Sequence, residues 1–471
     1  MMSAWSQPRR THGHVCRALT VVCVLSGAVS PALAQPSPPA FPITLQDAIR
    51  YASDNYPAIR AAQSRVAALE SGVDLAHTAY LPRVDSSLQI NRATRNNVAG
   101  LLVPGTTIPA ISGPVSDDTS WSSIWGSGAG VLVSWEAFDF GQRGASVDLA
   151  RAFVVRANAG ADITRLEVAV KTADAFLRLA AAQETVRAAR ANIERQQVFA
   201  NAVAVLVKNQ LRPGADDSRA QAELALARIQ VIQAEQAEQI ARASLEQWLA
   251  VRPASVQIAG GPLLQAPPQE TTTAPPVTMH PAAEAQMAAV ESSLALQHVL
   301  GRSYAPRINF QTAYSLRGTG ATANGTHLGG SHGLDFDTPN WAVGFTATFP
   351  VFDWFSLRER TRIEAHNERA ERATYDRVVQ ELSTQVEQAR AEMDGARRVA
   401  ENTPIQLQAA RVLEQQSRAR YDAGLATIIE VADSQRLLLQ AEVGDAVARL
   451  GVWRALVTDA AARGDISELL K

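Results

Sequence analysis

The chain contains the same order of sequence elements twice. Tyr80-Leu81-Pro82-Arg83 recurs as Tyr304-Ala305-Pro306-Arg307, and Phe138-Asp139 recurs as Phe352-Asp353. In each half the first element precedes a stretch of alternating apolar and polar residues. The second follows another such stretch and leads into a long run rich in Ala, Arg, Glu and Gln. This duplication predicts one structure built from two similar halves.

The repeat divides the chain into four predicted segments. They are a signal peptide at 1–34, a first repeat at 35–258, a Pro-rich connector at 259–281 and a second repeat at 282–471. Each repeat is predicted to contain a helix, a strand, a loop, a strand, a long helix and a returning helix. The first helix is expected at 44–79 with a break at Pro57, the long helices at 141–208 and 357–420, and the returning helices at 217–251 and 427–462. Pro404 is expected to kink the second long helix locally.

Residues 1–34 have the features of a secretory signal peptide. Three arginines precede a short apolar run at Ala18–Val29, and Ala32-Leu33-Ala34 resembles a cleavage site. The apolar run is shorter than the ~18–20 residues that a membrane-spanning helix requires. Cys16 and Cys23 are the two cysteines of the chain, and both lie in this segment. We therefore expect the exported chain to contain no disulfide and no cysteine metal ligand.

Four stretches have the two-residue period of β-strands, and polar segments at 96–120 and 319–340 are the predicted loops between them. In the clearest stretch, large apolar residues from Trp341 to Phe349 alternate with Gly, Ala and Thr. A strand with lipid on one side and water on the other has this pattern, although a soluble half-buried sheet has the same period. After residue 34 no apolar run reaches spanning length, so any membrane crossing would use the strands. Four strands cannot close a membrane barrel alone, so this alternative requires several copies of the chain.

Charge and motif content argue against several functional classes. Apart from the three arginines of 1–34, 41 basic residues stand against 46 acidic ones, and no basic face indicates nucleic-acid binding. We find no catalytic constellation, no cofactor-binding motif and no metal-ligand spacing, so we expect neither an enzyme nor a bound cofactor. Six histidines follow residue 34, and none has ligand spacing: His77, His280, His298, His327, His332 and His366.

Taken together, these elements resemble the TolC-like outer-membrane factor family over almost the whole chain after residue 34. Besides the duplicated elements, the resemblance rests on Leu45-Gln46-Asp47-Ala48, Asn55-Tyr56-Pro57, Tyr421–Thr427 and Glu430-Val431-Ala432-Asp433. It implies an α+β membrane protein that forms a homotrimer in the bacterial outer membrane. Each copy would supply four strands to one shared outer-membrane β-barrel. The helices would continue this barrel as a long periplasmic α-helical barrel.

The resemblance also implies the function of an outer-membrane channel in a tripartite efflux or export system. The channel would be a passive exit duct, to which an inner-membrane transporter delivers substrates through a periplasmic adaptor protein. The sequence contains no nucleotide-binding motif, which agrees with a passive role. Two alternatives remain. One is an outer-membrane duct for type I protein secretion. The other is a non-conducting envelope spacer made of coiled coils, which has no need of two-faced strands.

The resemblance places a periplasmic gate at the two turns between long and returning helices. It implies that Tyr421 bonds Asp216 and keeps the tip closed, and that Glu430 and Asp433 line the constriction. Glu430 and Asp433 are three residues apart and can share one helix face, where symmetry would turn each into a carboxylate ring that favours cations. Alternatively, the helix dipole favours both acids at a helix N-terminus, and Tyr421 packs between helices.

The turns are also the predicted contacts of the periplasmic adaptor. The residues concerned are Leu211, Pro213, Gly214, Gly424, Leu425 and Ala426. The two turns match across the repeat, so that Glu430 follows Asp216 by 214 residues. Some relatives have an arginine at the position of Ala426 that helps to close the tip, and its partner position is Ala215. That part of the closing arrangement is absent from this sequence.

Overall fold

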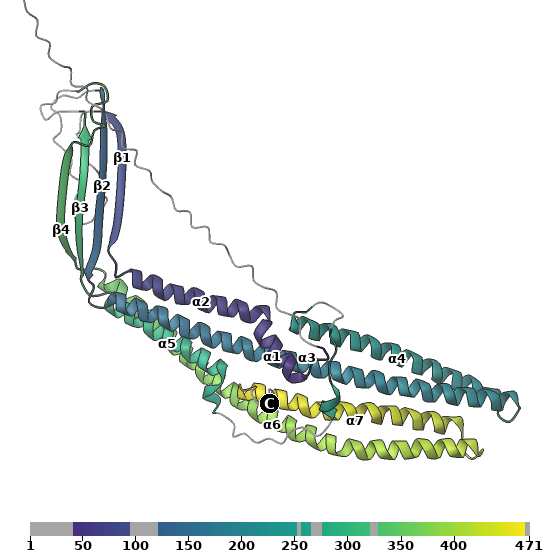
Figure 1. The fold of residues 1–471 in the computed structure, drawn as a ribbon. Coiled ribbons are helices and arrows are strands. Elements are labelled where there is room, and N and C mark those ends of the chain that lie inside the picture. Colours follow the sequence, from purple (N-terminus) through teal and green to yellow (C-terminus); the bar gives the residue numbers. More distant parts are fainter. Residues whose placement is uncertain (1–40, 95–120, 252–255, 265–275, 321–327, 467–471) are drawn as a thin grey trace, which may run out of the picture. The chain divides into compact units, whose positions relative to one another are not determined.

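The computed structural model describes residues 41–94, 121–251, 256–264, 276–320 and 328–466, and its two halves have the same order of helices and strands (Figure 1). The described residues belong to one unit, Pro39–Lys471. The first half contains α1 (Leu45–Asn55), α2 (Pro57–Thr78), β1 (Arg83–Thr94), β2 (Ser123–Phe138), α3 (Gln142–Lys208) and α4 (Gly214–Leu249). Two short 3₁₀ helices follow, η1 (Gly261–Leu264) and η2 (Val277–Met279). The second half contains α5 (Pro281–Arg302), β3 (Arg307–Thr319), β4 (Thr338–Thr348), α6 (Trp354–Asp422) and α7 (Ile428–Arg463).

Some predicted features lie outside the described residues. These are the signal peptide at 1–34, the loop at 96–120 and the central part of the connector, 265–275. Elsewhere the helices and strands lie where the sequence predicts them, with shifts of a few residues at their ends. The predicted loop at 319–340 is wrong at its end, because β4 begins at Thr338. The ladder extends that far because Thr338 pairs with Arg317 of β3.

Two prolines have different effects on their helices. At Pro57 the predicted break is confirmed: α1 ends at Asn55, Tyr56 is extended, and Pro57 begins α2. Pro404 lies inside α6, which runs past it without interruption. Proline has no N–H, so the Ala400 carbonyl loses its helical donor. The Thr403 hydroxyl lies 3.4 Å from that carbonyl, but its one proton has a closer acceptor in the Asp445 carboxylate at 3.0 Å.

The duplicated motifs of the first half build the corner between the sheet and α3. The Asp139 carboxylate accepts hydrogen bonds from the N–H groups of Gly141 and Arg143, at 3.2 and 2.5 Å, and so caps the start of α3. The Arg143 guanidinium also lies 4.7 Å from the centre of the Tyr80 ring. The Trp135 indole N–H of β2 donates to the Tyr80 carbonyl at 3.0 Å. The Tyr-x-Pro-Arg and Phe-Asp elements therefore meet in space and fix the direction in which α3 leaves the sheet.

The four strands form one antiparallel sheet in the order β1-β2-β3-β4. Its register places most of the large apolar residues on one face. The exposed members of this face are Val84, Leu88, Ile90, Val131, Trp135, Tyr314, Trp341, Val343 and Phe345. The opposite face carries small or polar residues such as Gly128, Gln311 and Gly344. The predicted two-faced strands are confirmed, and so large an exposed apolar patch indicates contact with a membrane or another protein.

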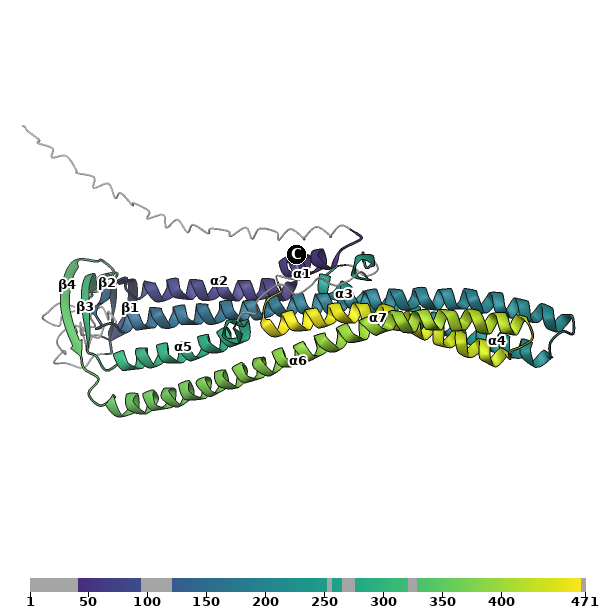
Figure 2. The same ribbon diagram turned by 90° about the horizontal axis from the view of Figure 1, so that it is seen from below.

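Helix α3 is the central element of the helical part. It packs along α2, α4, α5 and α7, whereas α6 packs along α5 and α7 (Figure 2). The main core cluster is rich in Ala and Leu and includes the fully buried Ile49, Phe176, Leu177, Leu245 and Leu450. Along the two helical hairpins, α3–α4 and α6–α7, the main contacts run in the order α4–α3–α7–α6. Among the described residues, no helix combines the length and the apolar character needed to cross a membrane.

The described ends of the connector are held in place by hydrogen bonds. Ile43, just before α1, forms a parallel bridge to Ile258 at the end of the first half. In η1, the Leu263 carbonyl accepts a hydrogen bond from the Trp453 indole of α7 at 2.9 Å. These contacts tie the residues just before α1 to the end of the first repeat, and η1 to α7.

His280 joins the start of α5 to the end of α7. Its ring is buried, Nδ1 accepts a hydrogen bond from the Ala282 N–H at 3.0 Å, and Nε2 lies 3.1 Å from the Ala461 carbonyl. Both contacts are satisfied by the neutral imidazole with its proton on Nε2. Burial lowers the pKa of His280, and the hydrogen bond to Ala461 partly offsets this effect.

His280 is expected to make the stability of the protein depend on pH. Because the folded-state pKa is lowered, the unfolded chain binds a proton first as the pH falls. The contribution of His280 is therefore complete above about pH 6.5, the ordinary value, and declines below it. His280→Asn keeps a helix-capping side chain without a titrating group. Thermal unfolding at about pH 7.5 and about pH 5.5 should show a smaller loss in this variant than in the wild type. Equal losses would contradict the prediction.

Candidate functional site

The two helical hairpins end in turns of the same backbone type, both at the helix ends away from the sheet (Figures 1 and 2). In the first turn Gln210 has a φ of +61°, and the Leu211 N–H donates to the Leu206 carbonyl at 2.9 Å. In the second turn Gly424 has a φ of +78°, and the Leu425 N–H donates back across the turn at 2.8 Å. These are Schellman motifs, in which a left-handed residue ends the helix.

Five of the six residues predicted to contact an adaptor are exposed at these turns: Leu211, Pro213, Gly214, Gly424 and Leu425. The leucines protrude most, with exposed fractions of 67% for Leu211 and 71% for Leu425. Ala426 differs, because only 7% of it is exposed. Its side chain is therefore not available to a partner.

Tyr421, in the last turn of α6, is the residue at which the two turns meet. Its hydroxyl donates to Oδ2 of Asp216, in the first turn of α4, at 3.2 Å. Its ring is buried and packs edge-on against Phe199 of α3, with 5.3 Å between the ring centres. The structure therefore brings Tyr421 and Asp216 together, and it also packs the tyrosine between helices.

An apolar cluster from α3, α4, α6 and α7 surrounds the Tyr421 ring. Its buried members are Phe199, Ala200, Val203, Ala220, Leu224, Tyr421, Ala426, Ile428 and Val431. Burial in this cluster is the largest cause that raises the pKa of Tyr421 to about 12, and the Asp216 carboxylate raises it further. The phenol is therefore neutral and able to donate a hydrogen bond throughout the physiological pH range.

Arg212, in the first turn, is a site residue that the sequence analysis does not single out. Its guanidinium carbon lies 4.4 Å from the centre of the Tyr421 ring, and its Nη2 donates to the Tyr421 carbonyl at 2.5 Å. One sequence signal could have indicated it, since Arg212 precedes Ala426 by the 214 residues that separate the turns. The chain thus has a cation in one turn and an alanine at the matching position of the other.

Glu430 and Asp433 lie at the start of α7, and both are exposed. Glu430 forms a capping box with Thr427: its carboxylate accepts from the Thr427 N–H at 3.1 Å, and its own N–H donates to the Thr427 hydroxyl at 3.4 Å. Asp433 forms an ion pair with Arg436 at 2.6 Å. Glu430 therefore caps the N-terminus of α7, as the alternative interpretation of this residue expects.

Two further ion pairs join α3 to α7 between the turns and the sheet. Arg195 donates two hydrogen bonds to the Glu442 carboxylate, at 3.2 and 2.9 Å. Nearer the sheet, the Arg454 Nε donates to the Asp174 carboxylate at 3.1 Å. Together with the Tyr421 contacts, these pairs hold the two hairpins side by side at three levels.

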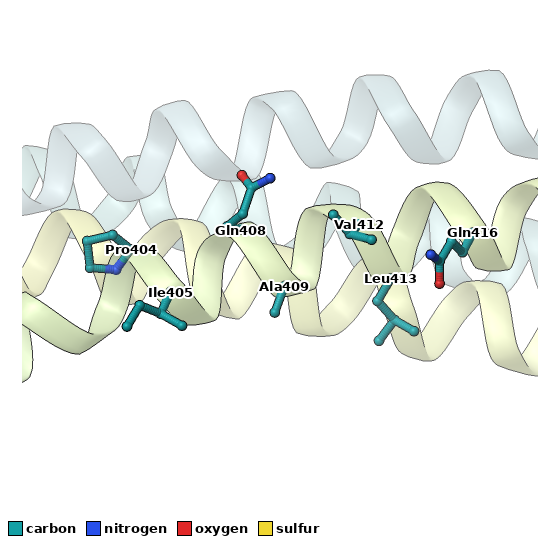
Figure 3. Close-up of a pocket in the computed structure, with 7 residues that line it drawn as sticks. All are labelled: Pro404, Ile405, Gln408, Ala409, Val412, Leu413 and Gln416. Atoms are coloured by element: carbon teal, nitrogen blue, oxygen red, sulfur yellow. The ribbon is translucent and has the colours of Figure 1, made fainter.

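An apolar groove of about 710 Å³ lies on α6 (Figure 3). It is lined by Pro404, Ile405, Gln408, Ala409, Val412, Leu413 and Gln416. Ile405, Ala409 and Leu413 recur every four residues and point to the same side of the helix in Figure 3. Ile405 is 69% exposed and Leu413 is 42% exposed. Helix α6 therefore presents an uncovered apolar strip.

Comparisons with known proteins agree on one family. The family model described as outer membrane efflux protein matches residues 48–251 and 280–458. Protein CyaE of Bordetella pertussis is 25% identical over 418 residues, which cover 87% of this chain and 82% of CyaE. The fold is similar to that of the Neisseria gonorrhoeae MtrE outer membrane channel in its open state, with a TM-score of 0.71, 20% identity and 89% of each chain covered. It is also similar to the Campylobacter jejuni CmeC outer membrane channel, with a TM-score of 0.72 and 15% identity over 89% of this chain and 85% of CmeC.

The family match extends through both repeats and includes both helical turns. The solved channels share the small antiparallel sheet and the long helices of this fold. This chain therefore belongs to the outer membrane efflux protein family, and it is a non-enzymatic channel protein of the outer membrane.

Proposed function

We propose that this chain is the passive exit duct of a tripartite efflux or export system. The observation that carries the proposal is a sheet with one exposed apolar face, followed by long helical hairpins whose turns are joined at Tyr421. In this arrangement the sheet lies in the outer membrane and the hairpins extend into the periplasm. An inner-membrane transporter supplies substrate and energy. A periplasmic adaptor contacts the turns, where Leu211 and Leu425 are exposed.

A duct of this kind requires more than one copy of the chain. Strands β1 and β4 are the edges of the sheet, and within it each pairs with one neighbour. In hydrocarbon every unpaired backbone group costs several kcal/mol, so an open sheet edge is not tolerated there. In the proposed homotrimer, β4 of one copy pairs with β1 of the next and closes a shared barrel. The number three comes from the family resemblance.

The helical part has apolar surfaces at matching heights that support the same assembly. The groove at Pro404–Gln416 lies about 12–30 Å along α6 from the turn at Gly424. On α4, Leu226, Ile229 and Ile232 are exposed and lie about 18–27 Å from the other turn. Helices α4 and α6 are the outer members of the order α4–α3–α7–α6. The apolar strip on α4 of one copy can therefore cover the groove on α6 of the next.

The proposed gate consists of the Tyr421–Asp216 bond together with the acids at the start of α7. Capping does not prevent Glu430 from also contributing to a ring of charge, because the capping contacts use Oε1 alone and leave Oε2 free of them. Asp433 would form the second ring, with part of its field offset by the nearby Arg436. Two rings of carboxylates at the tip would favour cations over anions.

Two other functions are distinguished by experiment. A non-conducting coiled-coil spacer would stay silent in a lipid bilayer even with its tip opened. A duct for type I protein secretion would conduct, but deleting the chain would abolish release of a secreted protein and leave sensitivity to small toxic compounds unchanged. A duct for efflux of small compounds would give the opposite pattern in the same cells.

Breaking the proposed gate bond is expected to open the channel. Tyr421→Phe with Asp216→Ala removes the donor and the acceptor, while the phenyl ring keeps its packing against Phe199. A hydrogen bond to a charged group contributes ~1.5–3 kcal/mol, so each copy that loses the bond should raise the ratio of open to closed channels about ten- to hundredfold. Single-channel recording in planar bilayers measures this ratio. Wild-type conductance in the double variant would remove the gate assignment, and silence of the correctly inserted variant would favour the spacer.

The acids of α7 are expected to affect ion selectivity separately from stability. Glu430→Gln with Asp433→Asn removes both charges but keeps a side chain that can cap the helix. Cation selectivity, measured as a reversal potential in a salt gradient, should fall, while the unfolding temperature should change little because both acids are exposed. Glu430→Ala also removes the cap, which should cost about 0.5–2 kcal/mol of stability. Unchanged selectivity in the first variant would leave Glu430 with its capping role alone.

Charges placed in the α6 groove are expected to prevent trimer formation. Ile405 and Leu413 are exposed in the single chain, so Ile405→Asp with Leu413→Asp should leave the chain folded. Burying two unpaired carboxylates against α4 of the next copy would cost several kcal/mol. Native mass spectrometry in detergent should therefore detect monomers. Arg411→Asp, at an exposed position of α6 that does not line the groove, is the matched control. A stable trimer of the double variant would show that the groove is not an interface.

A further inference from the structure

Arg212 makes two separate contacts with Tyr421. Its guanidinium carbon lies 4.4 Å from the centre of the tyrosine ring, within the range of a cation–π interaction. Its Nη2 donates a hydrogen bond to the Tyr421 carbonyl at 2.5 Å. One contact holds the side chain of the tyrosine, and the other holds its backbone.

The backbone contact lies at the C-terminal end of α6. Tyr421 is in the last turn, where carbonyl groups lack a partner within the helix, and its carbonyl also accepts from the Gly424 N–H at 3.0 Å. The helix dipole favours a cation at this end. Arg212 therefore acts as a capping cation for α6, although it belongs to the turn of the other hairpin.

The α3–α4 hairpin holds Tyr421 from several directions. Asp216 accepts a hydrogen bond from its hydroxyl, Arg212 covers its ring, and Phe199 packs against the ring edge. Arg212 and Asp216 stand on either side of the start of α4, where Pro213 fixes the backbone and precedes the first helical residue. The guanidinium and the carboxylate thus reach the tyrosine from one conformationally restricted turn.

From this geometry we infer that Arg212 is the positioning residue of the tip gate: it holds Tyr421 where the hydroxyl reaches Asp216, so that each chain fastens its own two turns together. This role rests on the proposed function and names the residue that controls its gate. It also explains how a chain with alanine at both 426 and 215 can hold its tip closed, since the cation comes from the first turn instead.

The two contacts need different properties of the arginine side chain. The planar guanidinium can lie against the tyrosine ring and donate to the carbonyl at the same time. Lysine supplies a charge near the carbonyl but has no plane to stack on the ring. Methionine is unbranched and apolar like the stem of arginine, and it has neither the charge nor a donor. The series Arg, Lys, Met should therefore weaken the gate in steps.

Single-channel recording of the assembled protein in planar bilayers tests the inference. For each copy that carries it, Arg212→Met should raise the ratio of open to closed channels about tenfold, and Arg212→Lys should give an intermediate value. Arg219→Met is the matched control, because Arg219 is an exposed arginine in the following turn of α4. It should gate as the wild type does.

A second pair of substitutions separates gate positioning from general support of the turn. Tyr421→Leu removes the ring, so adding Arg212→Met in this background should raise the open ratio by less than it does in the wild type. Equal increments in the two backgrounds would overturn the inference. If Arg212→Met does not assemble, Arg212→Lys decides the question, and wild-type gating of that variant would likewise overturn it.

The outcomes also separate the inference from the proposed duct. If Tyr421→Phe with Asp216→Ala opens the channel but Arg212→Met does not, the role of Arg212 is wrong and the duct stands. If every inserted variant is silent, including that double variant, the duct and the inference are both wrong.

Discussion

The structure depends on one constraint, which is that backbone groups in a sheet need partners. Strands β2 and β3 are paired on both sides, whereas β1 and β4 are each paired within the sheet to one neighbour. An exposed apolar face across all four strands indicates contact with lipid or protein. Lipid offers no hydrogen-bond partner for the backbone groups at the two edge strands. The duplication of the chain follows from this constraint. Each repeat contributes two strands and one long helical hairpin. Every pair of strands in the sheet is therefore matched by one hairpin in the helical part.

In the helical part, the contacts between the two hairpins differ in chemistry from the surfaces of the outer helices. Within the chain, polar contacts link the hairpins at three levels: Asp174 with Arg454, Arg195 with Glu442, and Asp216 with Tyr421. The outer helices α4 and α6 carry apolar strips instead. Ion pairs and hydrogen bonds fix the register of two helices, because a slip of one turn leaves charges unpaired. Apolar strips tolerate small shifts. The proposed assembly would therefore have hairpin pairs of fixed register that can slide against their neighbours in other copies.

The sequence predicts the elements of this fold well because strong periodic and steric signals set them. Alternation of apolar and polar residues defines the strands. Pro57 marks a helix start, because proline has no N–H to donate to the preceding turn of a helix. The start of β4 was harder, since residues before Trp341 are polar and loop-like, yet the ladder with β3 reaches Thr338. At Pro404 the predicted local kink stays a prediction, and the surrounding helix continues past the proline without a break. Long-range packing decides such positions, and it cannot be read from one segment.

The candidate site was predictable to a smaller extent. Periodicity does not indicate that Tyr421 meets Asp216; only the family resemblance did. Arg212 was missed because an arginine in a polar turn has no local signal that separates a solvent-exposed side chain from one stacked on a tyrosine. Residues that match across the repeat can also differ in role. Asp216 accepts a hydrogen bond from another hairpin, whereas the corresponding Glu430 caps its own helix. Repeat symmetry therefore locates the site but does not assign the side chains within it.

The position of the proposed gate contacts next to exposed leucines provides a route for control in the proposed assembly. Leu211 immediately precedes Arg212. Leu425 lies four residues after Tyr421, in the turn that follows the end of α6. A partner that binds these leucines better in an open arrangement shifts the equilibrium by its difference in affinity for the two arrangements. To move the tip from 1% to 99% open requires about 5.5 kcal/mol of such preference. In the proposed homotrimer this binding free energy is divided among three copies, about 2 kcal/mol per chain. That amount is close to the strength of one hydrogen bond to a charged group. A closing contact of this size is strong enough to hold each tip, and weak enough for a docked adaptor to release.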